Sequence, residues 1–207
     1  MVVETIEIIF QMNLDIDLFK IEYNKINPAK GKSLVAEPFL RDENFKRSIV
    51  FLVEHNDDGT IGFVLNKPVN IPITRVLDDF PNLGTSISLG GPVSNNSIHY
   101  IHTLGDLVPN SIEVKDGLYW GGDYEIIRDM VSNGMVDNKQ LKFFLGYSGW
   151  YPNQLKSELS QNSWIVTDLK PSVIMREKME DFWEDVLVSL GDKYKVWLNA
   201  PESPGFN

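Results

Sequence analysis

The chain has 207 residues, 43% of them apolar and 23% charged, so it can build one compact domain or two small ones without covalent cross-links. It contains no cysteine, which excludes a disulfide scaffold, a thiolate metal site and a cysteine nucleophile. Its 19 Lys and Arg residues against 29 Asp and Glu residues give a net charge of −10, which opposes binding to DNA or to an anionic membrane.

The first 32 residues are predicted to form an arm ahead of the domain. Glu4 and Glu7 precede the first basic residue, Lys20, whereas a secretory signal opens with basic residues. No run of the sequence approaches the ~20 apolar residues that a membrane-spanning helix needs. We therefore expect a cytoplasmic protein with no membrane partner. Residues 1–11 lack an evident packing partner, and Met12 is an alternative start.

The next segment is predicted to contain a β-hairpin. The first three expected strands cover residues 33–37, 48–55 and 60–66. A two-residue Asp58-Gly59 turn would join the last two strands and place His55 opposite Gly62. The glycine would then leave room beside the imidazole for a ligand, a water or packed backbone. Both faces of the hairpin are mostly apolar, so both must be covered by helices or by another sheet.

Strand and helix patterns interleave along the rest of the chain. The expected helices run from Pro72 to Phe80, from the N-cap Asp123 to Gly134, and over residues 152–161 and 179–190. The expected strands cover residues 86–89, 98–103, 112–114, 118–120, 141–147 and 163–167. Hairpins mixed with helices predict an α+β fold with a mixed sheet. We expect one domain over residues 33–198 and a C-terminal tail over 199–207.

The sequence offers three histidines and one serine motif as candidate chemistry. His99 and His102 stand three apart on an expected strand and so point to opposite faces, which makes them a poor metal pair. Gly146-Tyr147-Ser148-Gly149 is close to the G-x-S-x-G nucleophile elbow, but Trp150 follows where the motif has glycine. We interpret this motif as a strand-to-helix turn, and we expect no catalytic set, metal or cofactor.

Several stretches, taken together in their order and spacing, resemble the bacterial YqgE/AlgH family. They are residues 34–40, Asp42, 45–55, 62–68, the Gly90-Gly91-Pro92-Val93 turn and 145–150. The arm with Pro28-Ala29-Lys30-Gly31 resembles the Bacteroidetes branch. The resemblance implies a compact α+β fold with a bifurcated sheet and a small barrel around helices. It also implies a regulator of transcription, a label derived from a role ascribed to one member in alginate production.

Two interpretations of function follow. The first and favoured one is a regulatory or interaction protein of the cytoplasm that acts through a protein partner and does not bind DNA directly. The alternative is an enzyme or a small-molecule-binding protein with a polar site near the hairpin, around Asp42, Arg47, His55 and Asn66. The candidate residues for a functional surface, or for a structural brace, are Asp42, Arg47, His55, Asn66 and Trp150. The sequence names neither the partner nor the oligomeric state.

Overall fold

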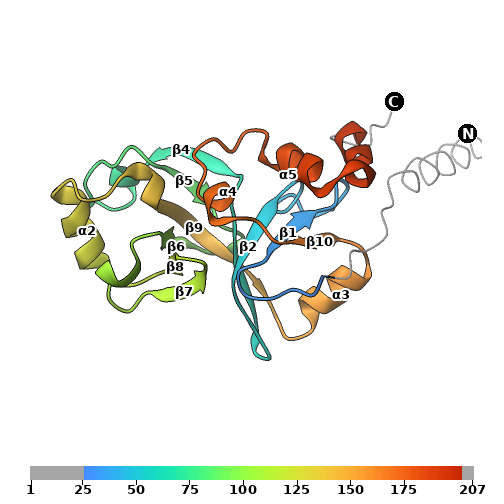
Figure 1. Cartoon of the computed structure of the whole chain (residues 1–207), viewed down its shortest axis with the longest axis horizontal. Helices are drawn as coiled ribbons and strands as arrows, with labels where there is room; N and C mark the ends of the chain where they lie inside the picture. Colours follow the sequence, from blue (N-terminus) through green and yellow to red (C-terminus); the bar gives the residue numbers. More distant parts are fainter. Residues whose placement is uncertain (1–25, 202–207) are drawn as a thin grey trace, which may run out of the picture.

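The computed structural model describes residues 26–201, a branched sheet with helices around it (Figure 1). The predicted arm up to residue 25, with Met12, and residues 202–207 of the predicted tail lie outside the described residues. The strands are β1 (Ser33–Ala36), β2 (Ile49–Asn56), β3 (Gly59–Val64), β4 (Pro68–Pro72), β5 (Ser86–Leu89), β6 (Val93–His102), β7 (Ile112–Lys115), β8 (Leu118–Trp120), β9 (Leu141–Trp150) and β10 (Trp164–Thr167). The α-helices are α2 (Tyr124–Ser132), α3 (Gln154–Ser160), α4 (Pro171–Ile174) and α5 (Phe182–Leu190), and 3-10 helices cover Ile73–Arg75, Gly105–Leu107, Asn138–Gln140 and Asp192–Asn199.

The sheet is mixed and branches at β9. The main path runs β10-β1-β2-β3-β9-β6-β8-β7, and its neighbours are antiparallel. Off this path, β5 pairs parallel with the middle of β9 and antiparallel with β4. The expected α+β class and bifurcated sheet are confirmed. The sheet is not closed into the expected barrel, because β10 and β7 do not pair in the described part and the branch carries β4 and β5 away from the main path.

Close-packed glycines make the branch possible. The Gly90 carbonyl accepts hydrogen bonds from Val64 N–H (2.9 Å) and from Ser148 Oγ (2.9 Å), while Gly90 N–H donates to the Leu145 carbonyl (2.9 Å). A Cβ on Gly90 would lie 2.3 Å from the Gly146 carbonyl oxygen, so no other residue fits there. Gly90, Gly91 and Pro92 form the short connection from β5 to β6, with a bend at Pro92. Ser148, however, lies inside β9 and not at the expected strand-to-helix turn.

The hairpin of β2 and β3 forms in a register different from the expected one. Asn56 pairs with Gly59, so the turn residues are Asp57 and Asp58, and His55 lies opposite Thr60. The Asn56 side chain selects this turn, since its Oδ1 accepts hydrogen bonds from the N–H groups of Asp58 (2.9 Å) and Gly59 (3.2 Å).

A bulge in β2 then shifts its pairing with β3 by one further residue. The pairing shifts between Leu52 and Glu54, which places Leu52 opposite Gly62 and Phe51 opposite Phe63. The expectation that His55 lies opposite Gly62 is wrong. The side chains that crowd Gly62 belong instead to Val50 and Leu52. An odd shift exchanges the two faces of a strand, so the expected grouping of side chains beyond the bulge is also wrong.

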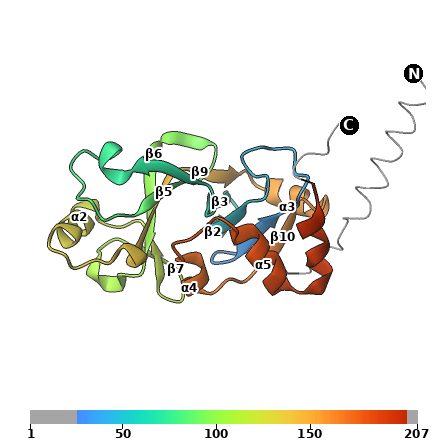
Figure 2. The same ribbon diagram turned by 90° about the horizontal axis from the view of Figure 1, so that it is seen from above.

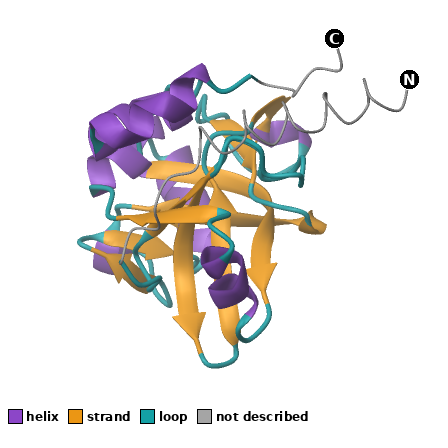
Figure 3. Ribbon diagram, turned by 90° about the vertical axis from the view of Figure 1, so that its right-hand side faces the viewer, coloured by secondary structure: helices purple, strands orange, loops and turns teal. Residues whose placement is uncertain are grey.

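Three apolar clusters fill the space between the sheet and its helices. Figure 3 shows how these helices lie around the sheet. Alternate β2 side chains enter different clusters: Phe51 packs with α4, α5 and the 3-10 helix Asp192–Asn199, and Leu52 packs with α3. The third cluster lies under α2, at the end of the molecule opposite α3 and α5 (Figure 2). Both faces of the hairpin are thus covered, as its apolar pattern predicted.

The helix expected from Pro72 to Phe80 is wrong. Pro72 ends β4, and only Ile73–Arg75 forms a 3-10 turn. Ile73 and Phe80 are nevertheless buried. The spacing therefore predicted which side chains are buried, but not the backbone conformation. A segment this short between two prolines gains little from helix formation and is shaped by its contacts. The helix after Asp123 is confirmed, and Asp123 caps it by accepting from two backbone N–H groups.

Candidate functional site

Arg47 and Asn66 form a brace between β2 and the segment that follows β3. Asn66 Oδ1 accepts a hydrogen bond from Ile49 N–H (2.8 Å), and Asn66 Nδ2 donates to the Arg47 carbonyl (2.9 Å). These bonds hold Arg47 at a positive φ of 50°, which is uncommon for a residue with a side chain. Nearby, Asp42 is exposed, and its Oδ1 accepts from Asn44 N–H (2.9 Å) to fix the preceding turn.

The Arg47 side chain ties the C-terminal segment to this brace. Its guanidinium donates to the Ala200 carbonyl (2.6 Å), lies 5.2 Å above the Trp183 ring and approaches Glu184 at 3.8 Å. Ala200, which falls in the predicted tail, is itself buried. The geometry shows how Arg47 and Asn66 support the fold through backbone groups far away in the sequence.

Trp150 is buried and serves the core. Its indole N–H donates to Glu158 Oε2 (2.9 Å), and the indole N–H of Trp164 donates to the same oxygen (2.8 Å). Phe45 stacks on Trp150 with ring centroids 5.8 Å apart. Both indoles are less than a tenth exposed, so this carboxylate satisfies two donors that water cannot reach.

His55 lies at the far end of β2 from the brace, about 20 Å away at ~3.3 Å per residue. It is exposed, and its Nδ1 lies 2.6 Å from Thr60 Oγ1. The five candidate residues therefore do not converge on one site. Asp42, Arg47 and Asn66 cluster at one end of the hairpin, whereas His55 stands at its tip.

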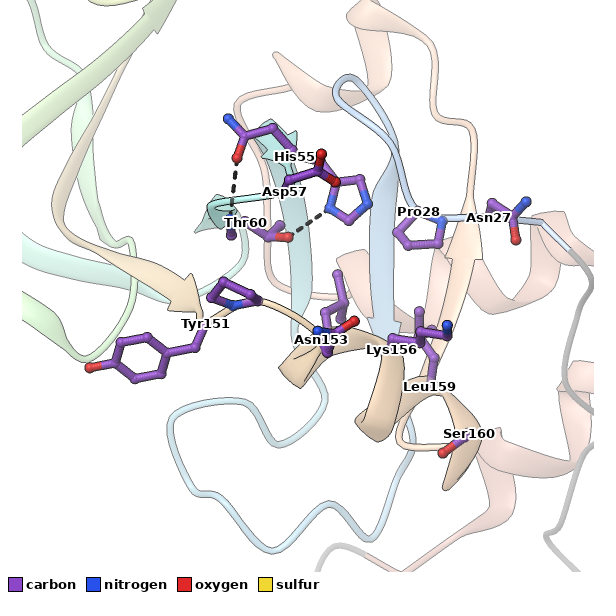
Figure 4. Close-up of a pocket in the computed structure, with 14 residues that line it drawn as sticks. Asn27, Pro28, His55, Asp57, Thr60, Tyr151, Asn153, Lys156, Leu159 and Ser160 are labelled. Carbon is purple, nitrogen blue, oxygen red and sulfur yellow. Dashed lines mark hydrogen bonds between the residues drawn. The ribbon is translucent and has the colours of Figure 1, made fainter.

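The hairpin tip separates two hollows, and His55 lines the larger one, of about 700 Å³. Figure 4 shows this hollow between the tip, the N-terminal part of the described chain and α3, with Pro28 and Lys156 on the sides away from the tip. The smaller hollow, of about 320 Å³, lies against β9. It is lined by Glu54, Asn56, Asp58, Gly59, Thr60, Ile61, Val93, Tyr147, Gly149, Trp150 and Tyr151.

The residues around these two hollows form what we call the tip surface, namely residues 54–60 with Tyr147 and Tyr151. Tyr151 lines both hollows and is 83% exposed, the largest exposure among the large hydrophobic residues described. Asp57 and Asp58 are exposed at the turn, and Glu54 is half-buried. The tip surface thus combines aromatic rings with carboxylates. Tyr151 was missed in the sequence, although it follows the buried Trp150 at the end of an alternating strand.

The groups suspected of chemistry have structural roles in the described part of the chain. Ser148 is fully buried and donates to the Gly90 carbonyl. His102 is fully buried, and Leu104 N–H donates to its Nδ1 (3.2 Å), which leaves the proton on Nε2, 2.9 Å from the Gly121 carbonyl. Burial lowers the pKa of both His99 and His102. Among residues 26–201, no group of His, Asp and Glu side chains could hold a metal ion.

The described helices are all too short or too polar to cross a bilayer.

Comparison with known proteins identifies relatives over nearly the whole chain. The chain is 38% identical over 197 residues to a UPF0301 protein of Bacteroides thetaiotaomicron, covering 95% of this chain and 100% of that one. It is 40% identical to a UPF0301 protein of Parabacteroides distasonis, covering 92% and 98%. The predicted resemblance, including its Bacteroidetes branch, is therefore confirmed.

Solved structures show the same fold. The AlgH protein of Pseudomonas aeruginosa matches with a TM-score of 0.68 and 26% identity, covering 86% of this chain and 98% of that one. A protein of Corynebacterium diphtheriae matches with a TM-score of 0.70 and 24% identity, covering 86% and 94%. The family model described as AlgH-like matches residues 33–195. The chain therefore belongs to the AlgH-like family.

Proposed function

We propose that this protein is a regulatory binding protein of the cytoplasm that holds a basic segment of a protein partner on its tip surface. The observation that carries the proposal is the smaller hollow, which two tyrosines, Tyr147 and Tyr151, and two acidic residues, Glu54 and Asp58, line together. An arginine or lysine side chain has the matching chemistry, because its stem is apolar and its head is cationic.

Charge favours this partner over the alternatives. A cation is attracted both by carboxylates and by the face of a tyrosine ring. The chain carries a net charge of −10, so its field attracts a basic segment and repels nucleic acid. If the protein influences transcription, it does so through the partner. The exposed Tyr151 suits the centre of an interface, where aromatic residues are enriched.

The placement of the other candidate residues supports binding over catalysis. The polar site of the alternative interpretation needs Asp42, Arg47, His55 and Asn66 together, and only His55 lines a hollow of the tip surface. In the serine motif, the Ser148 hydroxyl is buried and donates to the backbone carbonyl of Gly90. On the tip surface the Thr60 hydroxyl lies 2.6 Å from the His55 imidazole, but Thr60 is buried, so this hydroxyl is not presented to a substrate as a nucleophile.

A peptide-display selection on the purified full chain tests the proposal. We expect the enriched peptides to be rich in Arg and Lys, and their binding to weaken with salt. Asp58→Lys and Tyr151→Ala should each abolish most of the binding, whereas Asp106→Lys, which changes an exposed acid elsewhere, should not. Enrichment of acidic or uncharged peptides, or equal binding by the Asp58→Lys and Asp106→Lys variants, would refute the proposal.

A further inference from the structure

Lys142 is a partly buried lysine at the end of β9 remote from the tip surface. It stands eight residues before Trp150, about 26 Å along the strand. Its Nζ donates to the Arg176 carbonyl (2.9 Å). Burial, and to a lesser degree the Arg176 guanidinium, lower the pKa of Lys142 to about 7. Much of this amine is therefore uncharged near neutral pH, unlike that of an ordinary lysine.

A small cavity of about 90 Å³ adjoins the amine. Thr85 and Arg176 also line it, and Thr85 Oγ1 and Arg176 Nε are both buried without a hydrogen-bond partner among the described residues. Native structures rarely keep such groups unsatisfied. The Arg176 guanidinium is fixed in place, because it donates to Asp185 (2.7 Å) and lies 4.5 Å above the Phe182 ring.

The size and polarity of the cavity fit a small acceptor group attached to Lys142. A cavity of about 15 Å³ holds a single water, so a cavity of about 90 Å³ admits a carboxylate of three non-hydrogen atoms. Two carboxylate oxygens would give acceptors to the Thr85 hydroxyl and the Arg176 Nε–H. Their negative charge would also replace the repulsion between amine and guanidinium with an attraction. Glu177 also lines the cavity, but it is exposed, so solvent screens the repulsion from its carboxylate.

We propose that Lys142 is a site of reversible carbamylation by carbon dioxide. The uncharged Nζ attacks the carbon of CO₂, forming an N–C bond while one C–O π bond breaks and its electron pair moves to oxygen. The proton released from the nitrogen goes to solvent, and the product is an N-carboxylate on Lys142. No oxidant, reductant or leaving group takes part. The inference is independent of the partner proposed for the tip surface.

The test traps the carbamate on the intact protein. The full chain is equilibrated with ¹³C-bicarbonate at pH about 7.5, where an ordinary lysine is only about one-thousandth uncharged. Triethyloxonium then converts any carbamate to a stable ester, and peptide mass spectrometry locates it. We expect at least tenfold more ¹³C adduct on Lys142 than on the exposed Lys139, which serves as an internal control. Labelling of Lys142 no greater than that of Lys139 would overturn the proposal.

Two variants distinguish a carbamate that the cavity binds from one that forms only because the amine is reactive. Lys142→Met should lose the adduct while remaining folded. Thr85→Val keeps the shape of the wall and removes the hydroxyl, so it should lower the occupancy about tenfold, the effect of one hydrogen bond to a charged group. Unchanged occupancy in Thr85→Val would show that the cavity does not hold the carboxylate and would contradict the inference.

Discussion

Replacing Lys142 by methionine should make the protein more stable at neutral pH and should remove part of its pH dependence. The pKa of Lys142 is lowered from 10.5 to about 7 on folding. Between these values the unfolded chain binds a proton that the folded chain has released, so the free energy of unfolding rises with pH by about 1.4 kcal/mol per pH unit. At pH 7 the folded state therefore bears a cost of about 4 kcal/mol, which falls to about 2 kcal/mol at pH 9.

Methionine fills a similar volume without a charge to desolvate. Its cost is the Arg176 carbonyl left without its donor, about 1–3 kcal/mol. The Lys142→Met variant should thus be about 2 kcal/mol more stable than wild type at pH 7, and this advantage should shrink by about 2 kcal/mol by pH 9. Since the variant differs at one titrating group only, the contributions of the histidines, tyrosines and other lysines cancel in the difference.

Urea unfolding of both proteins at pH 7, 8 and 9, in buffer free of carbon dioxide, measures this difference directly. The Lys139→Met variant, altered at an exposed lysine three residues earlier, is the matched control and should run parallel to wild type. Parallel pH dependences of wild type and Lys142→Met would refute the reasoning, since they would show that Lys142 keeps its proton on folding.

Three further predictions concern the hairpin, the core and nucleic acid. Gly62→Ala should lower the free energy of unfolding by about 1–3 kcal/mol in urea melts, because its Cβ would lie 2.8 Å from Val50 Cγ1. Gly149→Ala on the facing strand should lower the free energy of unfolding clearly less, and equal losses would contradict the observed register. Glu158→Ala should lower the free energy of unfolding by about 3 kcal/mol, because it leaves two buried indole donors unsatisfied. Glu158→Gln should lower it less, because its amide oxygen can still accept a hydrogen bond, and identical losses would argue against this shared acceptor. Fluorescence anisotropy at low salt should show no sub-micromolar binding to duplex DNA, and tight, salt-sensitive binding would reverse the argument from charge.

The sequence predicts the elements of this fold better than their pairing. The strand Leu118–Trp120 lies where its pattern indicated, and the cap at Asp123 begins its helix. The hairpin register was not predictable from the Asp58-Gly59 pair, because the Asn56 side chain favours a turn one residue earlier and the bulge in β2 shifts the partners again. The turn is therefore decided by a side chain next to the Asp58-Gly59 pair, whereas the bulge depends on how β2 packs against β3.

The candidate site was predictable only where the signal is local. Trp150 and Asn66 belong to stretches that identify the family, but their partners, Glu158 and the Arg47 carbonyl, lie on other elements and cannot be assigned from spacing. Lys142 is the single charged residue of its strand, which normally indicates an exposed edge. Its burial depends on the segment around Arg176, far later in the chain, so no sequence window contains the information.

A charge-reversal cycle across the tip surface tests the central claim most directly. A basic peptide that binds the wild-type chain is titrated against wild type and Asp58→Lys, in its original form and with its essential basic residue replaced by Glu. If the hollow beside Tyr151 holds that residue, each single replacement should weaken binding, and the double replacement should recover at least about 1 kcal/mol of the loss. Losses that simply add, with no recovery in the double replacement, would contradict the account.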